Sequence, residues 1–259
     1  MSWFPLFLNL FALGTAGSIV AVPYKDIGKY YFKFHVLVAL VMVALAVALG
    51  QPWRGLGTGS PLARTAAVAS MLFAVLVLVE YVVVRAAGND LRRDALLLPV
   101  STGAVAVALA AFAEAGHGTA NAALLAAHRL TSAAVLGTSL VAMCTGHWYL
   151  SNAKLSFDIL TRLCRLFVAA VAAKALVSIV YLVANFARYR GLEDFDQLVI
   201  GVRLLAGLGF GLALAIMSLV CAKGRANQSA TGILYVGVVF VLIGETISMF
   251  LTLARKMPV

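Results

Sequence analysis

Apolar residues fill the chain in stretches of about 20, and short polar turns separate each stretch from the next. The stretches cover residues 5–23, 29–49, 63–85, 95–113, 122–147, 159–186, 197–221 and 230–254. A helix of about 20 apolar residues spans the roughly 30 Å hydrocarbon core of a bilayer. The pattern therefore predicts an all-α, polytopic integral membrane protein, a bundle of eight transmembrane helices. No polar stretch is long enough for another domain, so residues 1–259 are expected to form a single transmembrane domain.

The composition agrees with this pattern, since 63% of residues are hydrophobic, 12% are charged and the mean hydropathy is +1.00. A soluble domain has about 45–50% apolar and about 25% charged residues. The composition excludes a soluble enzyme, a secreted disulfide scaffold and a disordered chain. The net charge of +10 does not indicate a nucleic-acid partner, because basic residues of membrane proteins gather at the cytoplasmic rim.

Cysteine usage excludes two kinds of metal centre. The three thiols are Cys144, Cys164 and Cys221, and they contain no C-x-x-C pair. Neither an iron–sulfur nor a zinc framework can be built from them. A metal centre that serves this protein is therefore expected in a partner chain, or as a haem held by histidine.

Eight spans would place both termini on one side of the membrane. More Lys and Arg residues flank the spans on the opposite side, which predicts that the opposite side is cytoplasmic and that both termini lie outside. We expect a multi-pass protein of the bacterial cytoplasmic (inner) membrane. The basic residues of the opposite side are Lys25, Lys29, Lys33, Arg85, Arg92, Arg93, Lys154, Arg162, Arg165, Lys223 and Arg225, and those of the termini's side are Arg54, Arg64, Arg188, Arg190, Arg255 and Lys256.

Three ionisable residues fall deep inside predicted spans. At about 1.5 Å per residue, Arg203, Glu245 and Lys174 lie roughly 10, 15 and 18 Å from the side of the termini. Charged groups at such depth are costly and suggest function. The spans of Arg203 and Glu245 form a hairpin, so the two side chains could meet. They would then make a structural ion pair, or a catalytic pair on a proton or ligand path.

A second polar set lies near the opposite rim. His35, Glu80 and His147 fall on three different predicted spans, and His147 is followed by Trp148 and Tyr149. Two histidines at matching depth could ligate a b-type haem, and we expect no other metal site. Alternatively, the residues around His147 belong to an interfacial aromatic belt.

Two further residues, His128 and Arg129, open the fifth span on the side of the termini. They could face an anionic or quinone head group. The glycines between residues 201 and 211 lie inside an apolar span with no preceding strand, so they are expected to be close-packing surfaces between helices.

Three short patches resemble a known family. The run from Thr231 to the pair Gly244-Glu245 resembles the last helix of the membrane anchor subunit of bacterial dimethyl sulfoxide and polysulfide reductases. Leu49-Gly50-Gln51-Pro52-Trp53-Arg54 is similar to that family's Leu-Gly-x-Pro-x-Arg turn, and Arg203-Leu204-Leu205 resembles the start of its seventh helix. The resemblance covers the layout of the whole chain, but only these patches are specific.

The resemblance implies a quinone-interacting anchor. Such a subunit exchanges electrons and protons between menaquinone or ubiquinone in the lipid and a docked iron–sulfur subunit, beyond which lies a catalytic subunit of the molybdopterin type. The family often has a histidine before the Leu-Gly-x-Pro turn, where this chain has Ala48. The acidic residue expected near the outer rim of the third helix is also missing, and Glu80 lies at the other end. The quinone site is therefore expected either at His128, Arg129, Arg203 and Glu245 or toward His35, Glu80 and His147.

Other interpretations stay open from the sequence. The chain could be a b-type haem electron-transfer subunit that uses His35 and His147. It could also be a small secondary transporter with Lys174, Arg203 and Glu245 as its binding site, although the chain has no convincing internal repeat. A structural membrane scaffold is the remaining alternative.

Overall fold

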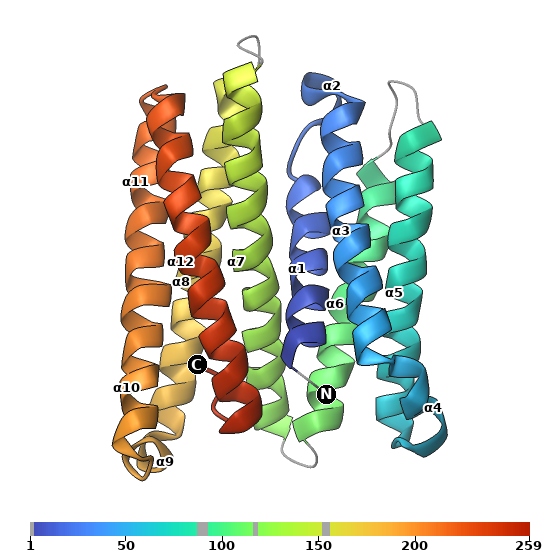
Figure 1. Cartoon of the computed structure of the whole chain (residues 1–259), viewed down its shortest axis with the longest axis vertical. Helices are drawn as coiled ribbons and strands as arrows, with labels where there is room; N and C mark the ends of the chain where they lie inside the picture. Colours follow the sequence, from blue (N-terminus) through green and yellow to red (C-terminus); the bar gives the residue numbers. More distant parts are fainter. Residues whose placement is uncertain (1–2, 87–92, 116–118, 152–155) are drawn as a thin grey trace. The chain divides into compact units, whose positions relative to one another are not determined.

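The computed structural model describes residues 3–86, 93–115, 119–151 and 156–259, and these contain helices and no strand (Figure 1). The all-α prediction is confirmed for these residues. The first elements are α1 (Trp3–Ile19), α2 (Tyr24–Ile27), α3 (Lys29–Gly50), the 3₁₀ turn η1 (Pro52–Arg54), α4 (Gly55–Thr58), α5 (Pro61–Ala86), α6 (Arg93–Ala115) and α7 (Thr119–Ser151). They are followed by α8 (Phe157–Ala184), α9 (Phe186–Arg190), α10 (Asp194–Val202), the π-helix η2 (Arg203–Phe210), α11 (Gly211–Lys223) and α12 (Asn227–Ala254).

Among the described residues, seven helices are long and apolar enough to cross a membrane. One of them is the continuous helix Asp194–Lys223, which joins α10, η2 and α11. The remaining predicted span, residues 5–23, corresponds to α1, which is shorter at 17 residues. The structure thus supports a multi-pass membrane protein, while the count of eight spans and the orientation of the termini stay predictions. Of the basic residues used for that orientation, Arg92 and Lys154 lie outside the described residues.

The chain folds into two compact units, which we call unit 1 (residues 1–137) and unit 2 (residues 138–259). The boundary falls inside α7. In unit 1, α3 packs against α1 and α5, and α6 packs against α1 and α5. In unit 2, α11 packs against α8 and α12, and η2 packs against α12.

Helix α5 illustrates how these helices suit a membrane. One stripe at helical spacing faces the interior of unit 1, and the opposite face is also apolar but exposed. A soluble helix would carry polar residues on that outer face, whereas lipid accepts apolar ones. The single ionisable member of the buried stripe, Glu80, therefore stands out. The buried stripe consists of Phe73, Val77, Glu80 and Val84, and the exposed face includes Val75, Leu78 and Val82.

Glycine allows the closest helix contact in unit 1. A methyl group on Gly14 of α1 would lie 1.8 Å from the carbonyl oxygen of Ala133 in α7. A methyl group on Gly137 would lie 1.9 Å from the carbonyl carbon of Gly14. Small residues spaced four apart let helix backbones approach in this way inside membranes. Any larger side chain at either glycine would force the two helices apart.

Candidate functional site

Unit 2 contains a buried charged cluster made of Lys174 in α8, Arg203 at the start of η2 and Glu245 in α12. Their side chains are 0%, 1% and 1% exposed. Arg203 Nη2 donates a hydrogen bond to Glu245 Oε1 over 2.7 Å. Lys174 Nζ lies 3.7 Å from Glu245 Oε2. The structure therefore brings Arg203 and Glu245 together, and it adds a second cation to the same carboxylate.

The three residues of this charged cluster lie at one depth. Lys174 and Glu245 precede the ends of α8 and α12, and Arg203 follows the start of α10, by nine or ten residues each. At about 1.5 Å per residue this is roughly 14–15 Å from one end of each helix. The depths expected from the sequence differed among the three residues, from roughly 10 to 18 Å, because the helices begin and end a few residues from the predicted limits. The charged cluster is thus placed about one third of the way along its helices, which are 28 to 30 residues long.

Two glycines make room for the Arg203 side chain. A methyl group on Gly207 would lie 2.2 Å from Arg203 Nη1 and 2.8 Å from the Cα atom of Gly244. A methyl group on Gly244 would lie 2.5 Å from the Cα atom of Gly207. The close-packing role predicted for the glycines of residues 201–211 is confirmed for Gly207. Arg203 also begins a π-helical turn, a deviation that occurs frequently at functional sites.

Unit 1 contains a different polar pair, His35 in α3 and Glu80 in α5, which are 1% and 4% exposed. His35 Nδ1 lies 2.9 Å from the carbonyl oxygen of Tyr31. Since a carbonyl only accepts, Nδ1 carries the proton and donates, and Nε2 is left as the second polar atom. Within the part of the chain that the structure describes, His35 Nε2 and both Glu80 carboxyl oxygens have no hydrogen-bond partner.

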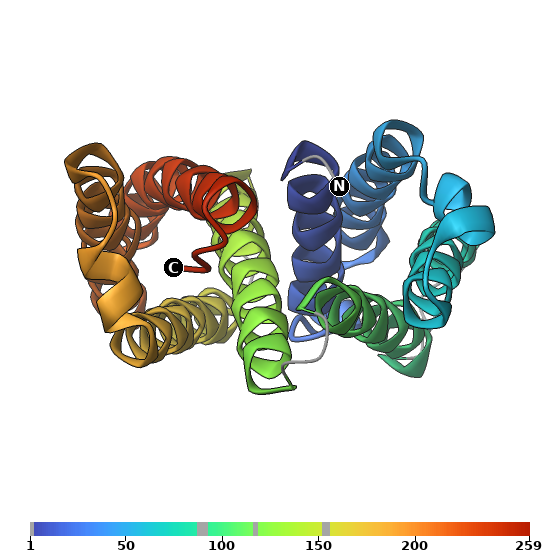
Figure 2. The same ribbon diagram turned by 90° about the horizontal axis from the view of Figure 1, so that it is seen from below.

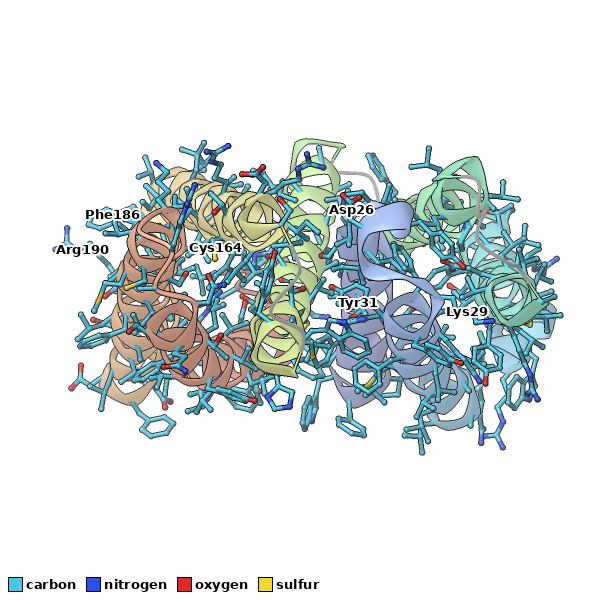
Figure 3. All side chains as sticks on the ribbon, turned by 90° about the horizontal axis from the view of Figure 1, so that it is seen from above. Asp26, Lys29, Tyr31, Cys164, Phe186 and Arg190 are labelled. Atoms are coloured by element: carbon cyan, nitrogen blue, oxygen red, sulfur yellow. The ribbon has the colours of Figure 1, made fainter. Side chains whose placement is uncertain are left out.

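The depths of His35 and Glu80 match. His35 lies six residues after the start of α3, and Glu80 lies six residues before the end of α5, two helices that pack against each other. Both therefore lie about 9 Å from the same end of unit 1. Figure 3 shows Tyr31 and Lys29 at this end of α3. Buried polar groups without partners are rare in folded proteins and call for a ligand, a water or a chemical role.

The residues after Gly146 lie in unit 2 and already make contacts there. His147 is exposed, and its Nδ1 atom is 3.1 Å from the hydroxyl of Tyr235. Trp148 is half-buried, and the hydroxyl of Tyr149 donates to the carbonyl oxygen of Ser156. His35 belongs to unit 1 and His147 to unit 2, so a shared haem between them stays a prediction.

His128 and Arg129 lie nine and ten residues into α7, and both are buried in unit 1. The Arg129 guanidinium forms an ion pair with Glu114, near the end of α6. The sequence reasoning missed this partner. The spacing gave little sign of it, because Glu114 lies one residue before the end of α6 whereas Arg129 lies ten residues into α7. Arg129 is thus engaged by a carboxylate of its own chain.

No protein-family model, curated protein or solved structure matches this chain. The likeness to reductase anchor subunits therefore depends on the three sequence patches alone.

Proposed function

We propose that this protein is the membrane subunit of a quinone-linked respiratory oxidoreductase and that the quinone head group binds between His35 and Glu80. One observation carries the proposal. These two side chains are buried at the same depth on packed helices, with no hydrogen-bond partner for His35 Nε2 or the Glu80 carboxyl among the described residues. The resemblance adds the expected partners, an iron–sulfur subunit and a molybdopterin-type catalytic subunit at the bacterial inner membrane.

The other candidate groups are less suited to a head group because they already hold partners. Glu245 accepts from Arg203, and Glu114 pairs with Arg129. A quinone at either place would have to displace a buried ion pair. Such displacement leaves a charge uncompensated and costs about 3–5 kcal/mol. The unpaired groups of unit 1 carry no such penalty.

The chemistry of the pair fits a quinol. With Nδ1–H bonded to Tyr31, a neutral His35 presents Nε2 as an acceptor for one quinol hydroxyl. The Glu80 carboxylate accepts from the other hydroxyl. Oxidation of one quinol releases two electrons and two protons; His35 and Glu80 each accept one proton, and the electrons pass to the docked iron–sulfur subunit. In quinone reduction the same groups return the protons.

Binding of a quinone analogue tests this proposal. The full-length protein in lipid nanodiscs should bind a ubiquinone or menaquinone analogue, and His35→Leu and Glu80→Leu should each weaken binding by about five- to tenfold, the value of one hydrogen bond of about 1 kcal/mol. The matched controls are His147→Leu and Glu193→Leu, whose side chains are exposed. Equal affinity in the wild type and both unit 1 variants would eliminate the site.

A small secondary transporter is the second candidate, and the charged cluster of unit 2 favours it. Transporter binding sites are typically built where a helix is irregular inside the membrane, and Lys174, Arg203 and Glu245 meet roughly 14–15 Å from one end of their helices, beside a π-helix. Proteoliposomes would distinguish the two. Ion or solute flux that is abolished by Lys174→Met and unchanged by His35→Leu would favour transport. A b-type absorbance spectrum of the purified protein that disappears in His35→Leu would favour haem instead.

A further inference from the structure

The last residues of the chain turn back into unit 2 instead of leaving it. We call residues 255–259 the strap. Figure 2 shows this segment directed inward among the helices of unit 2. Met257 and Val259 are fully buried. Lys256 has a φ of 56°, in the left-handed region that commonly ends a helix, and this conformation reverses the chain after α12.

Polar contacts fix the strap to three helices. The hydroxyl of Tyr181 in α8 donates to the carbonyl oxygen of Lys256 over 3.0 Å. The hydroxyl of Ser248 in α12 donates to the carbonyl oxygen of Val259. Arg255 Nε lies 3.0 Å from a carboxylate oxygen of Asp196 in α10, which is itself buried. The strap therefore bridges the same three helical segments that carry the charged cluster.

The strap lies between the charged cluster and the end of unit 2 that carries α9. Along α12, Ser248 follows Glu245 by three residues, about 4.5 Å. Tyr181 follows Lys174 by seven residues and Asp196 precedes Arg203 by seven, about 10 Å along each helix. The buried strap side chains are apolar. An apolar segment at this place separates the charged groups from water at that end of unit 2.

We propose that the strap is a lid that closes the α9 end of unit 2 over the Lys174–Arg203–Glu245 cluster. Water and ions reach the charged cluster from this end only when the strap leaves its contacts on Tyr181 and Ser248. The strap is held by a few hydrogen bonds and one partly exposed ion pair, so it can open without unfolding any helix. This inference concerns access in unit 2 and is independent of the quinone site proposed in unit 1.

A cysteine reporter between the strap and the charged cluster tests the lid. Ser178 is buried on α8, between Lys174 and Tyr181. Ser178→Cys is placed in a full-length chain whose three natural cysteines are replaced by alanine, and its reaction with a small, charged methanethiosulfonate is timed in nanodiscs. We expect slow labelling with the strap intact. Tyr181→Phe with Ser248→Ala should accelerate it at least about tenfold, because two hydrogen bonds hold the closed form.

The matched control pair makes the same chemical changes away from the strap. Tyr189→Phe alters a tyrosine of α9 that stacks on Phe186, and Ser70→Ala removes a hydroxyl bonded to its own helix in unit 1. This control should label as slowly as the parent. Fast labelling with the strap intact, or no acceleration in the strap variant, would overturn the lid.

Hydrogen–deuterium exchange gives an independent measurement that needs no reporter. The amide of Met257 donates to the carbonyl oxygen of Leu251 over 3.1 Å. A peptide covering the strap should exchange slowly in the wild-type protein and at least about tenfold faster in Tyr181→Phe/Ser248→Ala. Rapid exchange in the wild type would show that the strap is not seated, and would refute the proposal even if the cysteine variant fails to fold.

Discussion

The charged cluster predicts an order of stability among three single substitutions. Lys174→Met leaves the hydrogen-bonded Arg203–Glu245 pair, in which the formal charges balance. Arg203→Met leaves Lys174 and Glu245, which are balanced but 3.7 Å apart. Glu245→Gln leaves two buried cations that had shared one carboxylate. The loss of stability should therefore increase from Lys174→Met to Arg203→Met to Glu245→Gln.

The magnitudes follow from the contacts that each change removes. Lys174→Met exchanges a long ion contact for a packed apolar chain and should change the free energy of unfolding by about 1 kcal/mol or less. Arg203→Met removes a 2.7 Å bond to a charged group, a loss of about 1.5–3 kcal/mol. Glu245→Gln leaves buried positive charge without compensation, which costs about 3–5 kcal/mol.

The assay is equilibrium unfolding of the purified full-length protein in mixed micelles of increasing SDS fraction, followed by circular dichroism. The double variant Lys174→Met/Glu245→Gln leaves a single cation, so it should recover part of the loss of Glu245→Gln. If Glu245→Gln costs no more than Lys174→Met, water reaches the charged cluster and the argument from a dry interior is wrong.

Three further predictions concern packing and topology. Gly244→Ala should lose about 1–3 kcal/mol by overpacking against Gly207, whereas Gly232→Ala on the same helix meets nothing within 4 Å and should be tolerated; SDS titration measures both. Gly137→Ala should destabilise unit 1 by about 1–3 kcal/mol as well. An SDS unfolding midpoint equal to that of the wild type would refute the close contact of α1 with α7. A reporter enzyme active only outside the cytoplasm, fused after residue 254 in place of the strap, should be active, and an inactive fusion would reverse the predicted orientation.

Much of the fold could be predicted from the sequence because membrane insertion depends on the length and polarity of each segment. Every predicted span overlaps a helix of the structure, including the long helix in which α10, η2 and α11 are continuous. The hairpin of their spans also indicated that Arg203 and Glu245 could meet, as they do in the structure. The π-helical turn that begins at Arg203 did not, because its signal is a glycine-rich run that also fits ordinary close packing.

The candidate site could be predicted only in part from the sequence. His35 and Glu80 were identified as buried polar residues, but their lack of partners depends on how α3 and α5 are rotated about their axes. Conversely, Arg129 was expected to be available to a ligand, and the structure pairs it with Glu114. Sequence spacing gives the depth of a residue along a helix and does not give the direction of its side chain.

The sequence by itself indicated a multi-pass membrane protein, the approximate position of each helix and the ionisable residues that lie inside predicted spans. Each of these follows from the run of apolar residues around a position. Only the tertiary structure decided which submerged groups are paired, through glycine contacts such as Gly207 with Gly244 that set how closely two helices approach. It also placed the strap, since a few apolar residues after a helix become a buried segment only when neighbouring helices supply Tyr181, Ser248 and Asp196 as partners.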